Sequence, residues 1–376
     1  MPLWSGLFHN HLMKVLLVRG NPRKSGFTQY LVDLFASGLR DAGAQVTDVD
    51  LTTESHALKP CLGCYHCWLI KPGECIHHDP MEELLPALLA ADVLVCATPV
   101  YYFAMSSQLK NFFERTFPLT AEGLERSRMG MLRNRLREPA KWAGKKLISI
   151  TVGALRAREA YEPINQTFRL IADTLDMQLG GQLTRTESHL LPYRLSKPIT
   201  LKRVESAFVR AGREAATTGT LSAKTMASAE LPLSPDEDCF RTYGNIYWEH
   251  AASMGATKTN STGLQQQVGS DPDILMREMA RGIDPKTTAR LRAVLQFDFP
   301  DRQRHYRLTV NKGRCELKFE PTVAPDLRVT CALDIWVALF TRQLNVAAAL
   351  RQGVITLEGD KSLFTKLDRY FPPPAV

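Results

Sequence analysis

Four of the eight cysteines in this chain of 376 residues fall within one short stretch. They are Cys61, Cys64, Cys67 and Cys75, in the spacing C-x2-C-x2-C-x7-C. Thiolates bind metals and exchange disulfides, and a cubane 4Fe–4S cluster needs four thiolates that converge on it. The spacing therefore predicts a metal or redox site, with a 4Fe–4S cluster as the leading interpretation.

Three other interpretations of this stretch stay open. Four thiolates also bind zinc, although two separate C-x2-C pairs are the more usual zinc pattern. The cysteines could instead form a metal-free redox or disulfide site, although structural disulfides are uncommon in the cytoplasm, or they could be packed and reduced without a role. Three nearby histidines, His66, His77 and His78, are alternative ligands that four cysteines make unnecessary.

A second candidate site lies in residues 14–30, which read as a buried strand, a tight loop and the start of a helix. Such a loop presents backbone N–H groups and the positive end of a helix dipole, which suit a phosphate. Arg23 and Lys24 add charge, and Ser25 or Thr28 is expected to cap the helix. Neither a P-loop nor a G-x-G-x-x-G fingerprint is present, and an ordinary strand–turn–helix connection is the alternative.

Aromatic residues follow a later buried strand. A flat ring could lie there against backbone amides and an apolar wall, although each aromatic taken alone is better explained by core packing. The candidate residues are Thr98, Pro99, Val100, Tyr101, Tyr102 and Phe103.

Five buried strands alternate with helices in the first half of the chain, which predicts an α/β, doubly wound parallel sheet. Ligands of such sheets bind outside the carboxyl ends of the strands. The loops at 19–28, 98–106 and 153–158 are therefore expected to meet at one edge, which adds Gly153 and Ala154 to the candidate site. The strands are expected at 15–18, 45–51, 92–97, 145–152 and 177–184.

Residues 19–28 resemble the G-S-P-R-x-x-G-x-T loop of the flavodoxin-like NAD(P)H-dependent FMN reductases, with Asn21 and Phe27 in place of the usual Ser and Asn. Residues 98–115 resemble the T-P-[VI]-Y-x-x-x-[MP]-[ST] segment of that family and the helix after it, and residues 243–248 resemble its closing A-N-x-Y-W. The cysteine spacing resembles that of the iron–sulfur flavoproteins, a branch of the same group.

The resemblance implies a flavodoxin-like fold, FMN as cofactor, NAD(P)H as electron donor and a homodimer. It implies no catalytic side chain, because the flavin carries the chemistry, and it implies a 4Fe–4S cluster on the four cysteines. The implied FMN-binding residues are Asn21, Arg23, Ser25, Phe27, Thr28, Thr98, Pro99, Val100, Tyr101, Tyr102, Phe103, Gly153 and Ala154.

The net charge is +8, and part of it gathers in residues 125–146. This patch could attract nucleic acid or the phosphates of NADPH, but a solvated basic helix with loops is the favoured interpretation, and no nucleic-acid motif accompanies it. No apolar run approaches the roughly 20 residues that span a bilayer. Residues 1–13 do not resemble a signal peptide, so a cytoplasmic location is expected.

The last third of the chain has a different pattern. Alternating strands at 293–299, 305–310, 314–320 and 326–331 are followed by helices, which predicts an α+β domain with a hairpin at 311–313 and a terminal helix at 361–370. This part resembles the sterol-carrier-protein lipid-binding domain, which implies an apolar ligand. Core packing is the better explanation for each candidate ligand wall taken alone; these residues are Trp336, Leu339, Phe340, Leu363, Phe364 and Leu367.

The expected organisation is an extension at 1–13, the flavodoxin-like domain at 14–250, a linker at 251–271 and the sterol-carrier-like domain at 272–376. The expected function is that of an FMN-dependent NAD(P)H oxidoreductase, which passes electrons through the flavin and the cluster to a quinone-like or other apolar acceptor. The alternative is a non-enzymatic protein for lipid binding, electron transfer or redox sensing.

Overall fold

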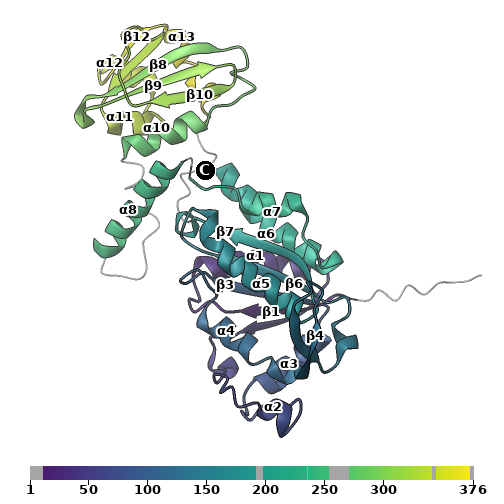
Figure 1. Cartoon of the computed structure of the whole chain (residues 1–376). Coiled ribbons are helices and arrows are strands. Elements are labelled where there is room, and N and C mark those ends of the chain that lie inside the picture. Colours follow the sequence, from purple (N-terminus) through teal and green to yellow (C-terminus); the bar gives the residue numbers. More distant parts are fainter. Residues whose placement is uncertain (1–11, 192–197, 235, 254–270, 341–343, 373–376) are drawn as a thin grey trace, which may run out of the picture. The chain divides into compact units, whose positions relative to one another are not determined.

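The computed structural model describes residues 12–191, 198–234, 236–253, 271–340 and 344–372 (Figure 1). The chain forms two compact units. The first combines the chain up to Ser188 with residues 203–231, and the second combines residues 189–202 with the chain from Pro232 onward.

The first unit is built on a five-stranded sheet in which all neighbouring strands are parallel. The sheet order, 2-1-3-4-5 when the strands are counted along the chain, is that of the flavodoxin-like fold, so the predicted doubly wound sheet is confirmed. In this order the strands are β2 (Gln45–Asp50), β1 (Lys14–Arg19), β3 (Val93–Pro99), β6 (Lys146–Val152) and β7 (Gln178–Arg185).

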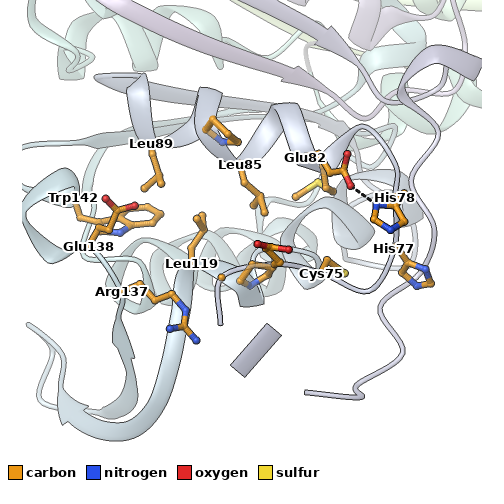
Figure 2. A pocket seen from close by; sticks show the side chains of 15 residues that line it. Cys75, His77, His78, Glu82, Leu85, Leu89, Leu119, Arg137, Glu138 and Trp142 are labelled. Carbon is orange, nitrogen blue, oxygen red and sulfur yellow. Dashed lines mark hydrogen bonds and ion pairs between the residues drawn. The ribbon is translucent and has the colours of Figure 1, made fainter. Parts of the chain in front are cut away.

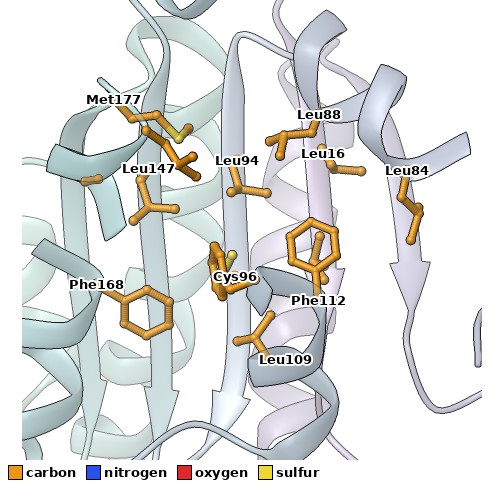
Figure 3. Packing of buried hydrophobic residues seen from close by; sticks show 14 of the residues in the cluster. Leu16, Leu84, Leu88, Leu94, Cys96, Leu109, Phe112, Leu147, Phe168 and Met177 are labelled. Atoms are coloured by element: carbon orange, nitrogen blue, oxygen red, sulfur yellow. The ribbon is translucent and has the colours of Figure 1, made fainter. Parts of the chain in front are cut away.

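One face of this sheet is covered by α3 (Met81–Ala90), α4 (Ser107–Glu114) and α5 (Glu162–Thr174). Their apolar side chains pack in one core cluster with Leu16 and Leu94 of the strands (Figure 3). This cluster fixes the helices that carry the candidate site against the sheet.

Helix α1 (Phe27–Asp41) packs tightly against α6 (Pro198–Thr218). A β-carbon on Gly38 would lie 1.9 Å from the Val209 carbonyl oxygen, so the two helices approach each other too closely for any larger residue. The position of α1, whose first turn faces the candidate phosphate site, is thereby fixed.

The basic segment folds as an antiparallel hairpin of β4 (Thr120–Arg126) and β5 (Leu132–Leu136), so the expected basic helix is wrong. Its charges are partly paired: Arg128 and Arg133 both bind the Asp176 carboxylate. From this two-stranded hairpin, the side chains of Arg128 and Arg133 reach Asp176, which lies after α5.

The second unit holds a mixed five-stranded sheet in which β8 and β11 are parallel and the other neighbours are antiparallel. The α+β prediction is confirmed, and the hairpin turns at Lys312 and Gly313, which both have positive φ, as a two-residue type I′ turn requires. In sheet order the strands are β10 (Arg314–Lys318), β9 (Arg304–Asn311), β8 (Arg292–Phe299), β11 (Leu327–Cys331) and β12 (Ile355–Gly359).

Helices accompany this sheet, and the expected single helix at 361–370 is in fact two short helices, because the chain turns at residues 365–366. The helices of the unit include α8 (Glu237–Ser253), α10 (Pro272–Arg281), α11 (Leu333–Phe340), α12 (Val346–Arg351), α13 (Lys361–Phe364) and α14 (Leu367–Tyr370).

Most of the candidate ligand walls lie in the core of this second unit. Trp336, Leu363, Phe364 and Leu367 are buried and Leu339 packs against them, whereas the side chain of Phe340 lies outside the described residues. In the described part of the chain, no helix has the length and the apolar character needed to cross a membrane.

Candidate functional site

The loop after β1 leaves the start of α1 open. The helix begins at Phe27 with Gly26 as its N-cap, and no described side chain caps it. The expected cap from Ser25 or Thr28 is therefore wrong, because Ser25 lies before the N-cap and Thr28 lies inside the helix. The first N–H groups of the helix, which have no partner within the helix, remain available to an anion.

The two cations of this loop differ in their partners. Lys24 binds the Asp50 carboxylate and donates to the Thr52 hydroxyl at 2.7 Å, so its charge is neutralised within the fold. Arg23 is exposed, and no ion pair engages it in the part of the chain that the structure describes. Arg23 is thus the cation of this loop that a bound anion can recruit.

Asn21 brings a buried acceptor to the same loop. Its side-chain amide donates to the Gln29 Oε1 at 2.9 Å and to the Arg23 carbonyl oxygen at 3.3 Å. Its Oδ1 is buried, and no described residue donates to it. Buried polar atoms are normally hydrogen-bonded, so this oxygen is suited to a hydroxyl donor of a ligand.

The loop after β1 and the loop after β3 touch each other. Ser106 caps α4 and its backbone N–H donates to the Thr98 hydroxyl at 2.9 Å. A β-carbon on Gly20 would lie 2.7 Å from the Ser106 Oγ and 2.8 Å from the Leu109 Cβ. The glycine at position 20 therefore allows the two loops to pack without a gap.

The aromatic segment after β3 forms a tight turn between Tyr101 and Ala104, whose backbones exchange two hydrogen bonds of 3.0 Å. Tyr102 (φ 46°) and Phe103 (φ 64°) adopt the left-handed conformation that favours glycine, and the Tyr102 side chain is 98% exposed. Such conformations cost about 1–3 kcal/mol each and gather at functional sites. The turn exposes its aromatic rings to solvent even though its left-handed residues are energetically unfavourable.

The third loop is closed by Tyr161. Its hydroxyl donates to the Leu155 carbonyl oxygen at 2.8 Å, and a β-carbon on Gly153 would lie 2.5 Å from that hydroxyl. Gly153 is buried and Ala154 is exposed. Because β1, β3 and β6 are neighbours and parallel, the three loops lie at one edge of the sheet, as predicted.

The predicted FMN-binding residues at this edge of the sheet differ in how far they are exposed to solvent. Arg23, Ser25, Tyr101, Tyr102, Phe103 and Ala154 are exposed; Phe27, Pro99 and Val100 are half-buried; Asn21, Thr28, Thr98 and Gly153 are buried.

The four clustered cysteines line one small cavity of about 50 Å³, and all four are free thiols. Burial, and after it the proximity of the other thiols, raises the pKa of Cys67. Among the described residues, no three His, Cys, Asp or Glu side chains are placed to hold a metal ion. In a cubane cluster each thiolate binds a separate iron, so its four sulfurs stand further apart than the ligands of one ion.

A buried ion pair fastens both ends of the cysteine stretch. The Arg115 guanidinium, just after α4, donates to both carboxylate oxygens of Asp79, at 2.6 and 3.1 Å, and to the Lys59 carbonyl oxygen at 2.6 Å. The side chains of Arg115 and Asp79 are only 1% and 3% exposed. Residues 59 and 79 are thus held at one point, and the chain between them forms a closed loop.

The same pair shapes the electrostatics of the loop. Burial alone would raise the pKa of Asp79, but hydrogen bonds from Arg115 and from the N–H groups of Lys59 and Met81 outweigh it and hold that pKa below its usual range. Arg115 also lies 3.4 Å from the Cys75 Sγ. The Arg115 side chain therefore joins the Asp79 carboxylate and the Cys75 thiol at one end of the loop.

The sequence analysis does not predict the pairing of Arg115 with Asp79. The one local signal is that each is a charged residue at the border of a helix, Arg115 after α4 and Asp79 before α3. The spacing of 36 residues between them gives no hint of the contact, which depends on the tertiary fold.

Replacing Arg115 with Met should lower the free energy of unfolding by about 3–5 kcal/mol, because the Asp79 carboxylate stays buried without its cation. Chemical denaturation of the full chain measures the effect. Lys110→Met is the matched control on the same helix, since its pair with Glu114 is largely exposed and is worth at most about 0.5 kcal/mol. Equal losses in the two variants would contradict the role assigned to Arg115.

The lowered pKa of Asp79 also predicts acid sensitivity. The ionised carboxylate stabilises the fold above its unfolded pKa of about 3.9, and this contribution disappears as the pH falls through the lower folded pKa. Asp79→Asn should therefore be less stable than the parent chain at neutral pH, with a difference that shrinks as the pH falls below about 4. A difference in unfolding free energy that is independent of pH would show that the charge of Asp79 is not what matters.

Part of this chain is similar in sequence to curated proteins. A curated iron-sulfur flavoprotein from Archaeoglobus fulgidus is 32% identical over 106 residues, which make up 28% of this chain and 46% of the relative. The iron-sulfur flavoprotein MJ0731 from Methanocaldococcus jannaschii is 35% identical over 121 residues, 32% of this chain and 59% of the relative. The chain spans about half the length of the curated relatives it matches.

Solved structures similar to the chain include an FMN-dependent NADH-azoreductase from Bacillus anthracis in complex with FMN, at 11% identity and a TM-score of 0.42, which covers 55% of this chain and 100% of that one. Another is an NAD(P)H:quinone oxidoreductase from Methanothermobacter marburgensis, at 16% identity and a TM-score of 0.38, which covers 54% and 96%.

Two family models match separate parts of the chain, in agreement with both predicted resemblances. The first is described as NADPH-dependent FMN reductase and the second as the SCP-2 sterol transfer family. The chain therefore joins an FMN-reductase-like domain, matched over residues 13–181, to an SCP-2 domain, matched over residues 275–372.

Proposed function

We propose that the first unit binds FMN at the edge formed by its three loops and passes electrons from NAD(P)H to an acceptor. The start of α1 and the Arg23 cation beside it carry this proposal: among the described residues, no side chain caps the helix and no carboxylate pairs with Arg23, so together they suit the dianionic phosphate of FMN. The match to the FMN reductase family supports it independently.

The residues at this edge fit the remaining parts of FMN. The Oδ1 of Asn21 is suited to a ribityl hydroxyl, and the hydroxyls of Ser25 and Thr28 to phosphate oxygens. The turn from Tyr101 to Ala104 offers an aromatic wall to the ring. Bound FMN would supply the redox chemistry between the nicotinamide and the acceptor. The protein would bind and orient FMN and the nicotinamide. The other residues proposed to contact FMN are Phe27, Thr98, Pro99, Val100, Gly153 and Ala154.

We also propose that Cys61, Cys64, Cys67 and Cys75 hold a 4Fe–4S cluster. They line one cavity as free thiols, and the Arg115 guanidinium donates to the Cys75 Sγ at 3.4 Å. The iron-sulfur flavoproteins among the relatives support the assignment. A cytoplasmic location, where thiols stay reduced, and a homodimer are part of the same proposal.

The SCP-2 match supports a role for the second domain in holding an apolar molecule, such as a quinone-like acceptor. The rival is a protein that binds lipid and carries or senses electrons without turnover. Steady-state oxidation of NADH or NADPH by the FMN-loaded chain, with a soluble dye as acceptor, separates the two. Turnover supports the oxidoreductase, and bound FMN that is never reduced by either nucleotide would overturn it.

Arg23→Ala should weaken FMN binding about tenfold, because it removes a charge-assisted contact with the phosphate. Titration of the FMN-free chain with FMN, followed by flavin fluorescence, measures the change. Arg40→Ala is the matched control, since Arg40 lies exposed in the last turn of α1, at the end of the helix away from the Arg23 loop. Unchanged affinity in Arg23→Ala, or an equal loss in Arg40→Ala, would place the phosphate elsewhere.

Replacing Tyr102 with Asn and Phe103 with Gly should stabilise the fold and weaken FMN binding. Asn-Gly suits a two-residue turn with positive φ, so the change relieves strain of about 1–3 kcal/mol per residue and also removes the rings. Thermal unfolding and FMN titration of the double variant test the two effects. If flavin affinity is retained, the rings of this turn do not contact the cofactor.

Cys64→Ala should abolish cluster binding without disturbing the core, since Cys64 is the exposed member of the four. Iron analysis of protein purified without oxygen should fall from about four irons per chain to below about one. The control is Cys96→Ala, whose thiol is buried in the core and does not line the cysteine cavity. Equal iron contents in the parent chain and both variants would exclude the cysteine cavity as the metal site.

A further inference from the structure

A cavity of about 420 Å³ in the first unit lies beside the cysteines and plays no part in the proposed FMN site (Figure 2). It runs along α3, from Cys75 and His77 at one end to Leu89 and Trp142 at the other (Figure 2). A volume of this size is that of a pocket for a small organic molecule. Its apolar wall is formed by Met81, Leu85, Pro86, Leu89, Pro118 and Leu119.

Two N–H donors in this wall have no acceptor. Trp142 is fully buried, and no described residue accepts a hydrogen bond from its indole N–H. The Nε–H of Arg137 is likewise buried and unpaired in the described part of the chain, while the Nη2 of the same side chain donates to the Cys67 carbonyl oxygen at 3.0 Å. A buried donor without a partner costs about 1–3 kcal/mol, so two at one cavity indicate that a ligand supplies the acceptor.

The charges around the cavity restrict that ligand further. Three exposed glutamates line it: Glu74, Glu82 and Glu138. Glu82 binds His78, and Glu138 binds Lys141. Because three carboxylates outnumber the one guanidinium, that of Arg137, among the lining side chains, the rim disfavours a fatty acid or another organic anion, whereas the unpaired donors disfavour a plain hydrocarbon or a cation. An uncharged molecule with an acceptor oxygen satisfies both conditions.

We propose that this cavity binds a small, uncharged ring compound whose carbonyl oxygen accepts a hydrogen bond from the indole N–H of Trp142. Leu85, Leu89 and Leu119 would enclose its ring. Because Cys75 and His77 also line the cysteine cavity, the bound molecule would lie next to the cysteine site. This proposal depends on the lining of the cavity alone and does not require that FMN binds to the chain.

Two naphthalenes of similar shape test the proposal: 2-acetylnaphthalene, which carries a carbonyl group, and 2-ethylnaphthalene, which does not. In equilibrium dialysis against the full chain, the ketone should bind about 3–10-fold more tightly than the hydrocarbon. Trp142→Phe keeps an aromatic ring but lacks the N–H, so it should lose that preference and retain its affinity for the hydrocarbon. An undiminished preference in Trp142→Phe would overturn the role of Trp142.

Leu89→Trp supplies the second variant, because a larger side chain at the partly buried position 89 fills the cavity. This variant should bind neither probe, while circular dichroism and thermal unfolding check that it is folded. Unchanged binding of the ketone by folded Leu89→Trp, or no binding of either probe by the parent chain, would overturn the proposal. The same dialysis with and without FMN separates the two proposals, since a chain that fails to bind FMN should still prefer the ketone.

Discussion

The buried ion pair between Arg115 and Asp79 is the contact on which the chemical part of this protein depends. The stretch between Lys59 and Asp79 has little regular structure beyond the four residues of α2 (His66–Leu69), so it cannot hold its cysteines in place by itself. Burying two charges is expensive unless each is well paired and hydrogen-bonded. Here the guanidinium and two backbone N–H groups saturate the Asp79 carboxylate, while the Nε–H of Arg115 has no described acceptor, and the loop is closed at the end of α4.

The candidate ligand sites share a physical property: the protein leaves polar groups unsatisfied or backbone strained where a ligand would compensate. The Oδ1 of Asn21 and the indole N–H of Trp142 are buried and lack described partners, and the start of α1 has no cap. Tyr102 and Phe103 hold positive φ angles that aromatic residues rarely adopt. Locally consistent sequences avoid such features, so each of them marks a candidate functional position in the first unit.

Much of the fold could be predicted because several strands of the first sheet are short runs of apolar residues in the sequence. Residues 15–18 and 93–97 are buried on both faces of the sheet, so their apolar runs predict parallel strands without an alignment of homologues. The turn of Lys312 and Gly313 could be predicted from its glycine. The β4–β5 hairpin could not, because its arginines concealed the strand pattern and their acidic partner, Asp176, lies forty or more residues away in the chain.

The candidate site was predicted at the level of loops and not of contacts. The sequence indicates which segments meet, since parallel strands bring their carboxyl ends to one edge. It does not indicate that Lys24 is neutralised by Asp50, that α1 lacks a side-chain cap, or that Trp142 faces a cavity without an acceptor. Each of these depends on tertiary distances between distant residues.

The most direct test is an absorbance spectrum of the full chain purified without oxygen, combined with FMN and iron analysis of the same sample. The expected result is about one FMN and about four irons per chain, with flavin bands above a broad cluster absorbance that bleaches on reduction. Iron-free protein with bound FMN would contradict the cluster and leave the flavin site standing. Protein that takes up no FMN, even when FMN is supplied, would contradict the central claim that this edge of the sheet is a flavin site.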